Sequence, residues 1–561
     1  MNRAVDRKFS IGLDYGTNSV RAIVVDLADG GEIAAGHYDY AGGDRGVLLD
    51  ARDPNLARQD PADYVEGYRR AVGEAVRAAR GRRGFRPDRV AGIGVDTTGS
   101  TPLPVDADGV ALATKRAFRK NLAAKAWLWK DHTSTAEAAE ITARAARGKD
   151  GYLTKCGGVY SSEWYWAKLL RCHRAAPAVI EAAAGWVELC DYVPGFLTGQ
   201  TAPQALPRSV CAAGHKAMYH EDWGGLPSRA FLRRLEPELE RFRASYAGVA
   251  LPSDRRAGTL TVEMANAVGL PAGIPVAVGA LDAHMGAVGS GVKPGTLVKI
   301  IGTSTCDITV WPLDRPLADV PGVCGIVPGS VLPDAYGLEA GQSAVGDIFD
   351  WFVRQLAPGG GGDDAHIRLT RAAAKLQPGQ SGLLALDWNN GNRTVLVDPL
   401  LTGMVLGQTL HTTAAEVYRA LIEATAFGAL MIIDRLEEYG VRIREIVNCG
   451  GIAEKNPLVM QIYADVTNRP MKVSRSAQSC ALGAAIFGAV AGGAFRSVAA
   501  AQRRMTGTKS ELFRPRRAAV AVYAELFRLY RQLHDAFGTN GGGGLHRVMK
   551  DLITLRDRAR R

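Results

Sequence analysis

The feature that most constrains the fold is a pattern that occurs twice, near the start of each half of the chain. Residues 9–26 read FSIGLDYGTNSVRAIVVD, and residues 295–311 read GTLVKIIGTSTCDITVW. In both segments two apolar runs flank a short polar turn containing Gly-Thr, which predicts a β-hairpin. Two hairpins with the same turn chemistry predict a duplicated architecture, with one hairpin in each half of the chain.

The rest of the chain alternates between strand-like and helix-like patterns. Its 561 residues are too many for one ordinary hydrophobic core, so we expect at least two domains. Strands are predicted at 90–96, 276–279 and 445–449, and helices at 64–80, 162–173, 414–439 and 456–468. This alternation predicts α/β domains. The Ala- and Gly-rich stretch 481–495 is too short to cross a bilayer comfortably and predicts a tightly packed, buried helix.

Composition narrows the class of protein. Hydrophobic residues make up 47% and charged residues 22%, as in ordinary globular proteins, and the start of the chain has no apolar stretch of signal-peptide type. We therefore expect a soluble, cytoplasmic protein without a membrane partner. The eight cysteines show no zinc-ligand spacing, which predicts reduced thiols in the core.

The formal net charge of +11 raises the question of a nucleic-acid partner. The basic residues are spread along the chain and interleaved with acidic ones; only residues 547–561 concentrate them. That segment is typical of a solvated helical end rather than a binding arm. We therefore expect no nucleic-acid partner.

The two hairpin turns are candidate phosphate sites. A turn rich in Gly, Thr and Ser can present backbone N–H groups and hydroxyls to phosphate oxygens. The candidate residues are Gly16, Thr17, Asn18 and Ser19 in the first turn, and Gly302, Thr303 and Ser304 in the second. Asp14, just before the first turn, adds a carboxylate suited to Mg²⁺, directly or through water. Either turn alone is typical of an ordinary hairpin, but the pair favours nucleotide binding.

A third candidate is the segment NCGGIAEKN at 448–456. Gly450 and Gly451 follow a buried strand and would let a planar ring approach the backbone. The next helix N-terminus and Asn456 can bond a ligand. On its own, a Gly-Gly turn of this kind is usually just a strand-to-helix connection.

In this order, DYGTNS, GALDAH at 279–284, IGTST and NCGG resemble the motifs of the FGGY carbohydrate-kinase family, over about residues 9–538. The resemblance implies an α/β fold of two actin-like (ribonuclease H-like) lobes with a nucleotide and sugar cleft between them. It implies ATP and Mg²⁺ as cofactors and a homodimer as the family-level expectation. With a Pro-marked boundary after Gly291, we expect an N-terminal lobe at 1–291, a C-terminal lobe at 292–540 and a basic tail at 541–561.

The same resemblance assigns the catalytic base to Asp282. Phosphoryl transfer to an alcohol needs an acceptor that aligns the hydroxyl and takes its proton, and a single carboxylate suffices. Read in isolation, Asp282 is typical of a helix N-cap. His284 has no Cys, Glu or His partner at local ligand spacing, so we expect a supporting or core residue.

Within the family, the sugar-binding segments resemble those of the members that phosphorylate L-ribulose. These segments are 94–102, 128–133, 155–160, 214–218, 337–343 and 529–538. The resemblance implies that Gly99, Lys216 and Glu339 join Asp282 around the sugar, and that ATP phosphorylates O5 of L-ribulose in L-arabinose catabolism. Two tryptophan clusters, at 127–129 and 163–166, are either sugar-stacking surfaces or packing aromatics.

Three alternatives stay open. One is another kinase of the family, acting on D-ribulose, xylulose or a related polyol. A second is a nucleotide-driven assembly protein related to actin or chaperones, which would need no sugar pocket. The third is a sugar-sensing DNA-binding regulator, although no helix-turn-helix pattern precedes Phe9. Whether Cys306 or Cys449 is reactive is also open.

Overall fold

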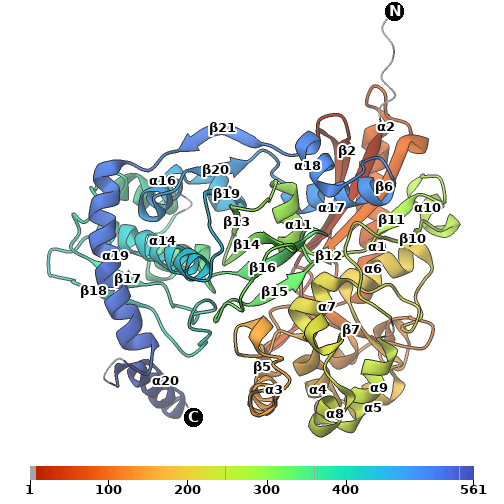
Figure 1. Cartoon of the computed structure of the whole chain (residues 1–561), viewed down its shortest axis with the longest axis horizontal. Coiled ribbons are helices and arrows are strands. Elements are labelled where there is room, and N and C mark those ends of the chain that lie inside the picture. The colour runs from red at the N-terminus through yellow and green to blue at the C-terminus, as the bar shows by residue number, and fades with distance from the viewer. Residues whose placement is uncertain (1–7, 247, 359, 363, 542–543, 561) are drawn as a thin grey trace, which may run out of the picture.

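The computed structural model describes residues 8–246, 248–358, 360–362, 364–541 and 544–560. Within them, two large seven-stranded sheets form the centres of two lobes, which lie side by side in Figure 1. The first sheet has the order β10-β11-β6-β1-β2-β3, with β12 also paired to β6; the second has the order β15-β16-β14-β13-β19-β20-β21. The predicted two-lobed α/β fold is confirmed.

Both predicted hairpins are confirmed, and they occupy equivalent places in the two sheets. In the first sheet β1 pairs antiparallel with β2 and parallel with β6; in the second, β13 pairs antiparallel with β14 and parallel with β19. The first sheet consists of β1 (Phe9–Tyr15), β2 (Ser19–Asp26), β3 (Glu32–Asp39), β6 (Val90–Thr97), β10 (Arg256–Thr259), β11 (Pro275–Ala277) and β12 (Ala280–Leu281). The second consists of β13 (Thr296–Ile301), β14 (Thr305–Pro312), β15 (Gly325–Pro328), β16 (Ala335–Ala340), β19 (Glu445–Cys449), β20 (Met471–Ser474) and β21 (Thr508–Phe513).

Short sheets and helices surround these two sheets. The short strands are β4 (Leu48–Asp50), β5 (Asp53–Gln59), β7 (Pro102–Val105), β8 (Ala126–Trp127), β9 (Gly185–Glu188), β17 (Leu384–Leu386) and β18 (Met404–Leu406). Helices before residue 291 are α1 (Pro61–Gly67), α2 (Gly73–Arg80), α3 (Thr135–Arg147), α4 (Tyr165–Ala175), α5 (Pro177–Ala182), α6 (Leu189–Thr198), α7 (Val210–Ala217), α8 (Arg229–Leu235), α9 (Pro237–Ser245), α10 (Val262–Val268) and α11 (Asp282–Gly289). Later helices are α12 (Gly346–Asp350), α13 (Ala365–Ala373), α14 (Ala414–Glu438), α15 (Gly451–Lys455), α16 (Pro457–Thr467), α17 (Ser479–Ala491), α18 (Val498–Met505), α19 (Arg517–Gly538) and α20 (Val548–Ala559).

The predicted helix at 64–80 begins earlier than its pattern suggested. Asp60 caps α1 by accepting from the Ala62 N–H, and Pro61 occupies the first helical position, where no N–H is needed. A π-helical turn at Tyr68–Val72 then joins α1 to α2.

Helix α17 is the predicted buried helix, and it joins the two lobes. It comes from the second half of the chain but packs against β1 and β6 of the first sheet and against α11. Gly12 and Gly94 make this possible, because a Cβ at either position would lie 1.8 Å from the carbonyl oxygen of Ala481 or Ala484. The sheet and the helix are therefore in direct backbone contact, and larger residues would force them apart.

Three further expectations concern the thiols, the membrane and the tail. All eight cysteines are free in the structure, in agreement with the prediction of reduced thiols. No helix within the described part of the chain is long and apolar enough to span a bilayer. In the predicted tail, α20 packs through buried Met549, and Lys550 Nζ lies 2.6 Å from Asp398 Oδ2. Residues 542, 543 and 561 of that tail lie outside the described residues.

Candidate functional site

The first hairpin turn is held from outside by neighbouring loops. Within it, the Gly16 N–H donates to the Ser19 carbonyl at 2.9 Å. Thr17 accepts from Trp129 Nε1 at its hydroxyl, at 3.0 Å, and from a glutamine amide at its carbonyl. Asn18 Nδ2 donates to the Arg45 carbonyl at 2.5 Å. The turn is thus held in one conformation by hydrogen bonds to neighbouring segments, as a preformed phosphate cradle requires.

The second turn and the Gly-Gly turn lie side by side, because Ile300 of β13 pairs with Cys449 of β19. Gly302 and Thr303 are exposed, and the Thr303 carbonyl accepts from the Val345 N–H at 2.8 Å. Gly450 has φ of +95°, and a Cβ there would lie 2.5 Å from the Ile301 carbonyl oxygen. The structure therefore brings 302–304 and 450–451 together at one edge of the second sheet.

Asn456 has a structural task that its pattern did not reveal. Its side-chain oxygen accepts from the Val459 N–H at 3.2 Å and caps α16. A ligand would therefore meet the amide NH₂ of Asn456 rather than its oxygen.

Three aspartates gather where neighbouring strands of the first sheet end. Asp14 of β1 pairs in register with Asp96 of β6, and β12, which also pairs with β6, ends one residue before Asp282. Asp14 and Asp282 are half-buried, whereas Asp96 is fully buried with both carboxylate oxygens lacking a hydrogen-bond partner among the described residues. Asp96 was missed as a site residue, although it stands out as a carboxylate in the apolar strand GIGVDT.

Electrostatics single out this group of carboxylates. Burial, followed by the negative charge of Asp14, raises the pKa of Asp282 to about 7. Burial and the charges of Asp14 and Asp282 raise the pKa of Asp96 well above its usual value. Burial also raises the pKa of Asp14, partly offset by Arg21. The cluster is short of positive charge, the condition in which a hard divalent cation binds carboxylates.

Lys216 of α7 and Glu339 of β16 form a buried ion pair between segments from the two halves of the chain. Lys216 Nζ lies 3.1 and 3.0 Å from the two carboxylate oxygens, and Arg393 lies 3.8 Å from one of them. Although burial opposes both charges, Lys216 holds the pKa of Glu339 well below its usual range and Glu339 raises that of Lys216. Glu339 raises the pKa of Asp282 and Lys216 lowers it, so the charges of the ion pair reach the predicted base.

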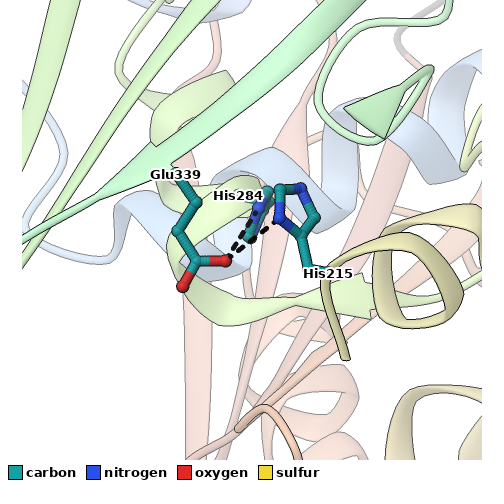
Figure 2. Close-up of side chains that lie close together, drawn as sticks. All are labelled: His215, His284 and Glu339. Carbon is teal, nitrogen blue, oxygen red and sulfur yellow. Dashed lines mark ion pairs between the residues drawn. The ribbon is translucent and has the colours of Figure 1, made fainter. Parts of the chain in front are cut away.

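Two histidines face the same glutamate, as Figure 2 shows. Glu339 Oε2 lies 3.3 Å from His215 Nδ1 and 3.7 Å from His284 Nε2. Burial lowers the pKa of His284 to about 4 and that of His215 well below its usual value, so both rings are neutral near pH 7. The expectation that His284 is a core residue is confirmed, and its ligand-type neighbours, His215 and Glu339, come from distant segments that local spacing does not show.

Gly99 lies in the loop after β6, and its need for a small side chain has a packing cause. A Cβ there would lie 2.3 Å from a methyl carbon of Leu281, the residue before Asp282. Lys168 Nζ holds the loop by donating to the Ser100 carbonyl at 2.8 Å. The glycine thus lets the loop approach the predicted base.

The structure also bears on the role of the tryptophan clusters and on whether Cys306 or Cys449 is reactive. Trp127, Trp164 and Trp166 pack in one hydrophobic core, although the Trp164 ring lies 5.5 Å from Lys216 Nζ. Burial raises the pKa of Cys306 to about 12 and also that of Cys449, so both thiols are protonated near pH 7 and poor nucleophiles.

Comparison with known proteins gives a consistent picture. Residues 9–289 match the N-terminal domain, and residues 297–492 the C-terminal domain, of the FGGY family of carbohydrate kinases. The chain is 42% identical to a ribulokinase from Geobacillus thermodenitrificans over 99% of this chain and 98% of the relative. It is 41% identical to a ribulokinase from Mycolicibacterium smegmatis over 99% and 97%.

A solved structure shares the fold. The xylulose kinase from Rhodospirillum rubrum superposes with a TM-score of 0.76 at 25% identity, covering 94% of this chain and 99% of that one. Sequence, motif order and architecture agree over nearly the whole length. The chain belongs to the FGGY family of carbohydrate kinases.

Proposed function

We propose that the protein transfers the γ-phosphate of ATP to O5 of L-ribulose, giving L-ribulose 5-phosphate and ADP, as a step of L-arabinose catabolism in the cytoplasm. The observation that carries the proposal is the position of Asp282. Asp282 follows β12, whose neighbour β6 carries Asp96 in register with Asp14 of β1, and the charges of Asp14, Glu339 and Lys216 all act on the pKa of its half-buried carboxylate. One carboxylate thus faces a phosphate side and a sugar side.

In this reaction Asp282 accepts the proton of the O5 hydroxyl as the bond from O5 to the γ-phosphorus forms. The bond from that phosphorus to the bridging oxygen of ADP breaks, and the electron pair leaves with ADP. A pKa of about 7 leaves a substantial ionised fraction at neutral pH and suits a proton acceptor. Because the transition state is loose, alignment of the hydroxyl matters more than the strength of the base.

The phosphates are proposed to lie between the turns of the two lobes. Gly16, Thr17, Asn18 and Ser19 would bind them from the first lobe, and Gly302, Thr303 and Ser304 from the second. Gly450, Gly451 and Asn456 would contact the adenosine. The exposed backbone of the second turn and its position beside Gly450 support this assignment. We propose lobes at 1–291 and 292–540 and a tail at 541–561, with α17 as the helix that crosses between the lobes.

The aspartate pair fits a magnesium ion. Asp96 offers two buried carboxylate oxygens without partners, next to Asp14, and carboxylate oxygen is the ligand that Mg²⁺ prefers. Asp14 and Asp96 would hold the ion directly or through water. When bound, it would neutralise charge on the transferring phosphate.

The sugar is proposed to contact Lys216, Glu339, Asp282 and the loop at Gly99. A buried ammonium and carboxylate supply one donor and one acceptor set for hydroxyls, an arrangement typical of polyol sites. The choice of L-ribulose rests on the full-length similarity to proteins named ribulokinase at 41–42% identity. Xylulose is the main rival, because the similar solved structure is a xylulose kinase.

The test is ADP release with Mg²⁺ and ATP against L-ribulose, D-ribulose, L-xylulose, D-xylulose and glycerol, compared by kcat/KM. We expect L-ribulose to lead by at least about tenfold, well within the discrimination that a site built to hydrogen-bond a hydroxyl can reach. A lead for another sugar would keep the kinase and overturn the sugar assignment. ADP release independent of every sugar would point to a nucleotide-driven assembly protein instead.

A further inference from the structure

Three ligand-type side chains meet inside the molecule without satisfying one another. His215 of α7, His284 of α11 and Glu339 of β16 are buried, and one ligand atom from each lies within 4.8 Å of the other two (Figure 2). Gly325, which pairs with Glu339 across β15 and β16, makes room for the His215 ring, because a Cβ there would lie 1.9 Å from Nδ1. The cluster is therefore assembled from four separate segments.

Ser330 favours one tautomer of His215. An arrangement in which Ser330 Oγ donates to the Val327 carbonyl at 3.0 Å and accepts from His215 Nε2–H at 3.0 Å satisfies both contacts. The neutral ring then has a lone pair on Nδ1, the atom that lies 3.3 Å from Glu339 Oε2. A lone pair facing a carboxylate oxygen at this distance is repulsive unless a cation lies between them.

His284 poses the same problem more strongly. Neither of its ring nitrogens has a hydrogen-bond partner among the described residues, although the side chain is buried. Its Nε2 faces the same carboxylate oxygen at 3.7 Å. Buried polar atoms of this kind are normally bonded, so the ring nitrogens of His284 are available to bind a ligand.

The spacing of these atoms suits a metal ion. Zn²⁺ binds imidazole nitrogen and carboxylate oxygen at about 2.0–2.2 Å in a tetrahedron, which places neighbouring ligand atoms roughly 3.4 Å apart. The two observed separations, 3.3 and 3.7 Å, lie on either side of this value. Ser330 would then have the usual role of a group that orients a ligating histidine through its other nitrogen.

We propose that His215 Nδ1, His284 Nε2 and Glu339 Oε2 bind a zinc-class transition-metal ion. Two imidazoles and one carboxylate favour Zn²⁺ or its neighbours over Mg²⁺, which prefers oxygen alone. Lys216 Nζ lies 3.1 Å from Oε1 and 3.0 Å from Oε2 of Glu339, so metal binding at Oε2 requires the ammonium to shift to Oε1 alone. This inference rests on the proposed function, in which Lys216 and Glu339 bind the sugar. The metal and the sugar therefore compete for Glu339.

The direct test is calorimetric titration of ZnCl₂ into the full chain after removal of metals by a chelator, without nucleotide or sugar. We expect one zinc site whose affinity falls at least 100-fold in His215→Gln and in His284→Gln. The matched control is His366→Gln, because His366 is a partly exposed histidine that also faces a carboxylate, Asp350, at 3.3 Å. Melting curves without metal check that each variant folds.

A second measurement replaces Zn²⁺ by Co²⁺, whose visible absorption reports its ligands. We expect intense tetrahedral bands without a cobalt–thiolate band, which excludes the eight cysteines as ligands. Unchanged zinc affinity in both histidine variants, or a thiolate band, would overturn the site. Zinc binding that depends on the histidines but is unaffected by L-ribulose would keep the site and overturn the competition.

Discussion

The hairpin turns of the two lobes share one backbone plan but differ in charge. Each first strand pairs antiparallel with its hairpin partner and parallel with a strand from further along the chain. Two residues before the turn glycine, the first lobe has Asp14 and the second has Ile300; their partners across the parallel pair are Asp96 and Cys449. The duplicated scaffold can thus offer a turn to phosphates from both sides, while at these matched positions the first lobe has two carboxylates and the second has none.

The second lobe does contain a buried carboxylate near its turn, but it is neutralised. Asp307 of β14 lies 2.8 Å from Lys299 Nζ through both oxygens, and the same ammonium donates to Gln342 at 3.0 Å. Asp96, by contrast, has two oxygens without partners among the described residues. The difference teaches that, beside the two hairpin turns, the fold leaves a buried carboxylate unpaired in the first lobe and neutralises the one in the second.

The strongest test of the comparison is to substitute the residues at two equivalent positions, Asp96 in the first lobe and Cys449 in the second. We expect Asp96→Asn to lower kcat about 100- to 1,000-fold, the usual size when one group that organises transition-state charge is lost. The control, Cys449→Ala, alters the matching position of the second lobe and should keep kcat within about threefold. Steady-state kinetics with a Mg²⁺ titration measure both; equal losses would contradict the asymmetry.

We expect the second lobe to contribute to sugar binding through Glu339 of β16 rather than through its turn. We expect Glu339→Gln to raise the KM for L-ribulose about 10- to 100-fold, because a charged hydrogen bond contributes about 1.5–3 kcal/mol. Glu163→Gln loses only a 3.9 Å approach to Arg393 and serves as the control. An unchanged KM in Glu339→Gln would remove Glu339 from the sugar site.

The like charges of the first lobe predict a pH dependence. The base acts in its ionised form, so kcat/KM should fall about tenfold per pH unit below the Asp282 pKa of about 7 and level off above it. Asp14→Asn removes the neighbouring negative charge and should move this acidic limb to lower pH, whatever it does to the absolute rate. A limb that stays in place would show that Asp14 does not act on Asp282.

The smallest effect on turnover is expected where α17 packs against the first sheet. Gly94→Ala adds a methyl group 1.8 Å from the Ala484 carbonyl oxygen, so we expect about 1–3 kcal/mol of lost stability in urea unfolding. Gly361→Ala, with no atom within 4 Å of the added carbon, is the control and should be neutral. Equal stability of the two variants would contradict direct contact between α17 and the first sheet.

The sequence predicted those elements whose local residue pattern is enough to specify them. The hairpins were predictable because apolar runs flank Gly-Thr turns, and α17 because a helix so rich in Ala and Gly fits only close packing. The proposed role of Asp96 was not predictable, because its register with Asp14 depends on a parallel pairing that no local pattern specifies. The neighbours of His284 were not predictable for the same reason: they come from α7 and β16, which only the tertiary fold brings to α11.

The most direct test of the central claim is Asp282→Asn, measured by single-turnover transfer of labelled γ-phosphate to L-ribulose and by calorimetric sugar binding. Asparagine keeps the shape and the oxygen that accepts from the Ala283 N–H at 2.7 Å, so the fold should survive. We predict sugar affinity within about threefold of the unmodified protein and a transfer rate lower by about 100- to 10,000-fold, the range for loss of a general base. A transfer rate close to that of the unmodified protein would contradict the account.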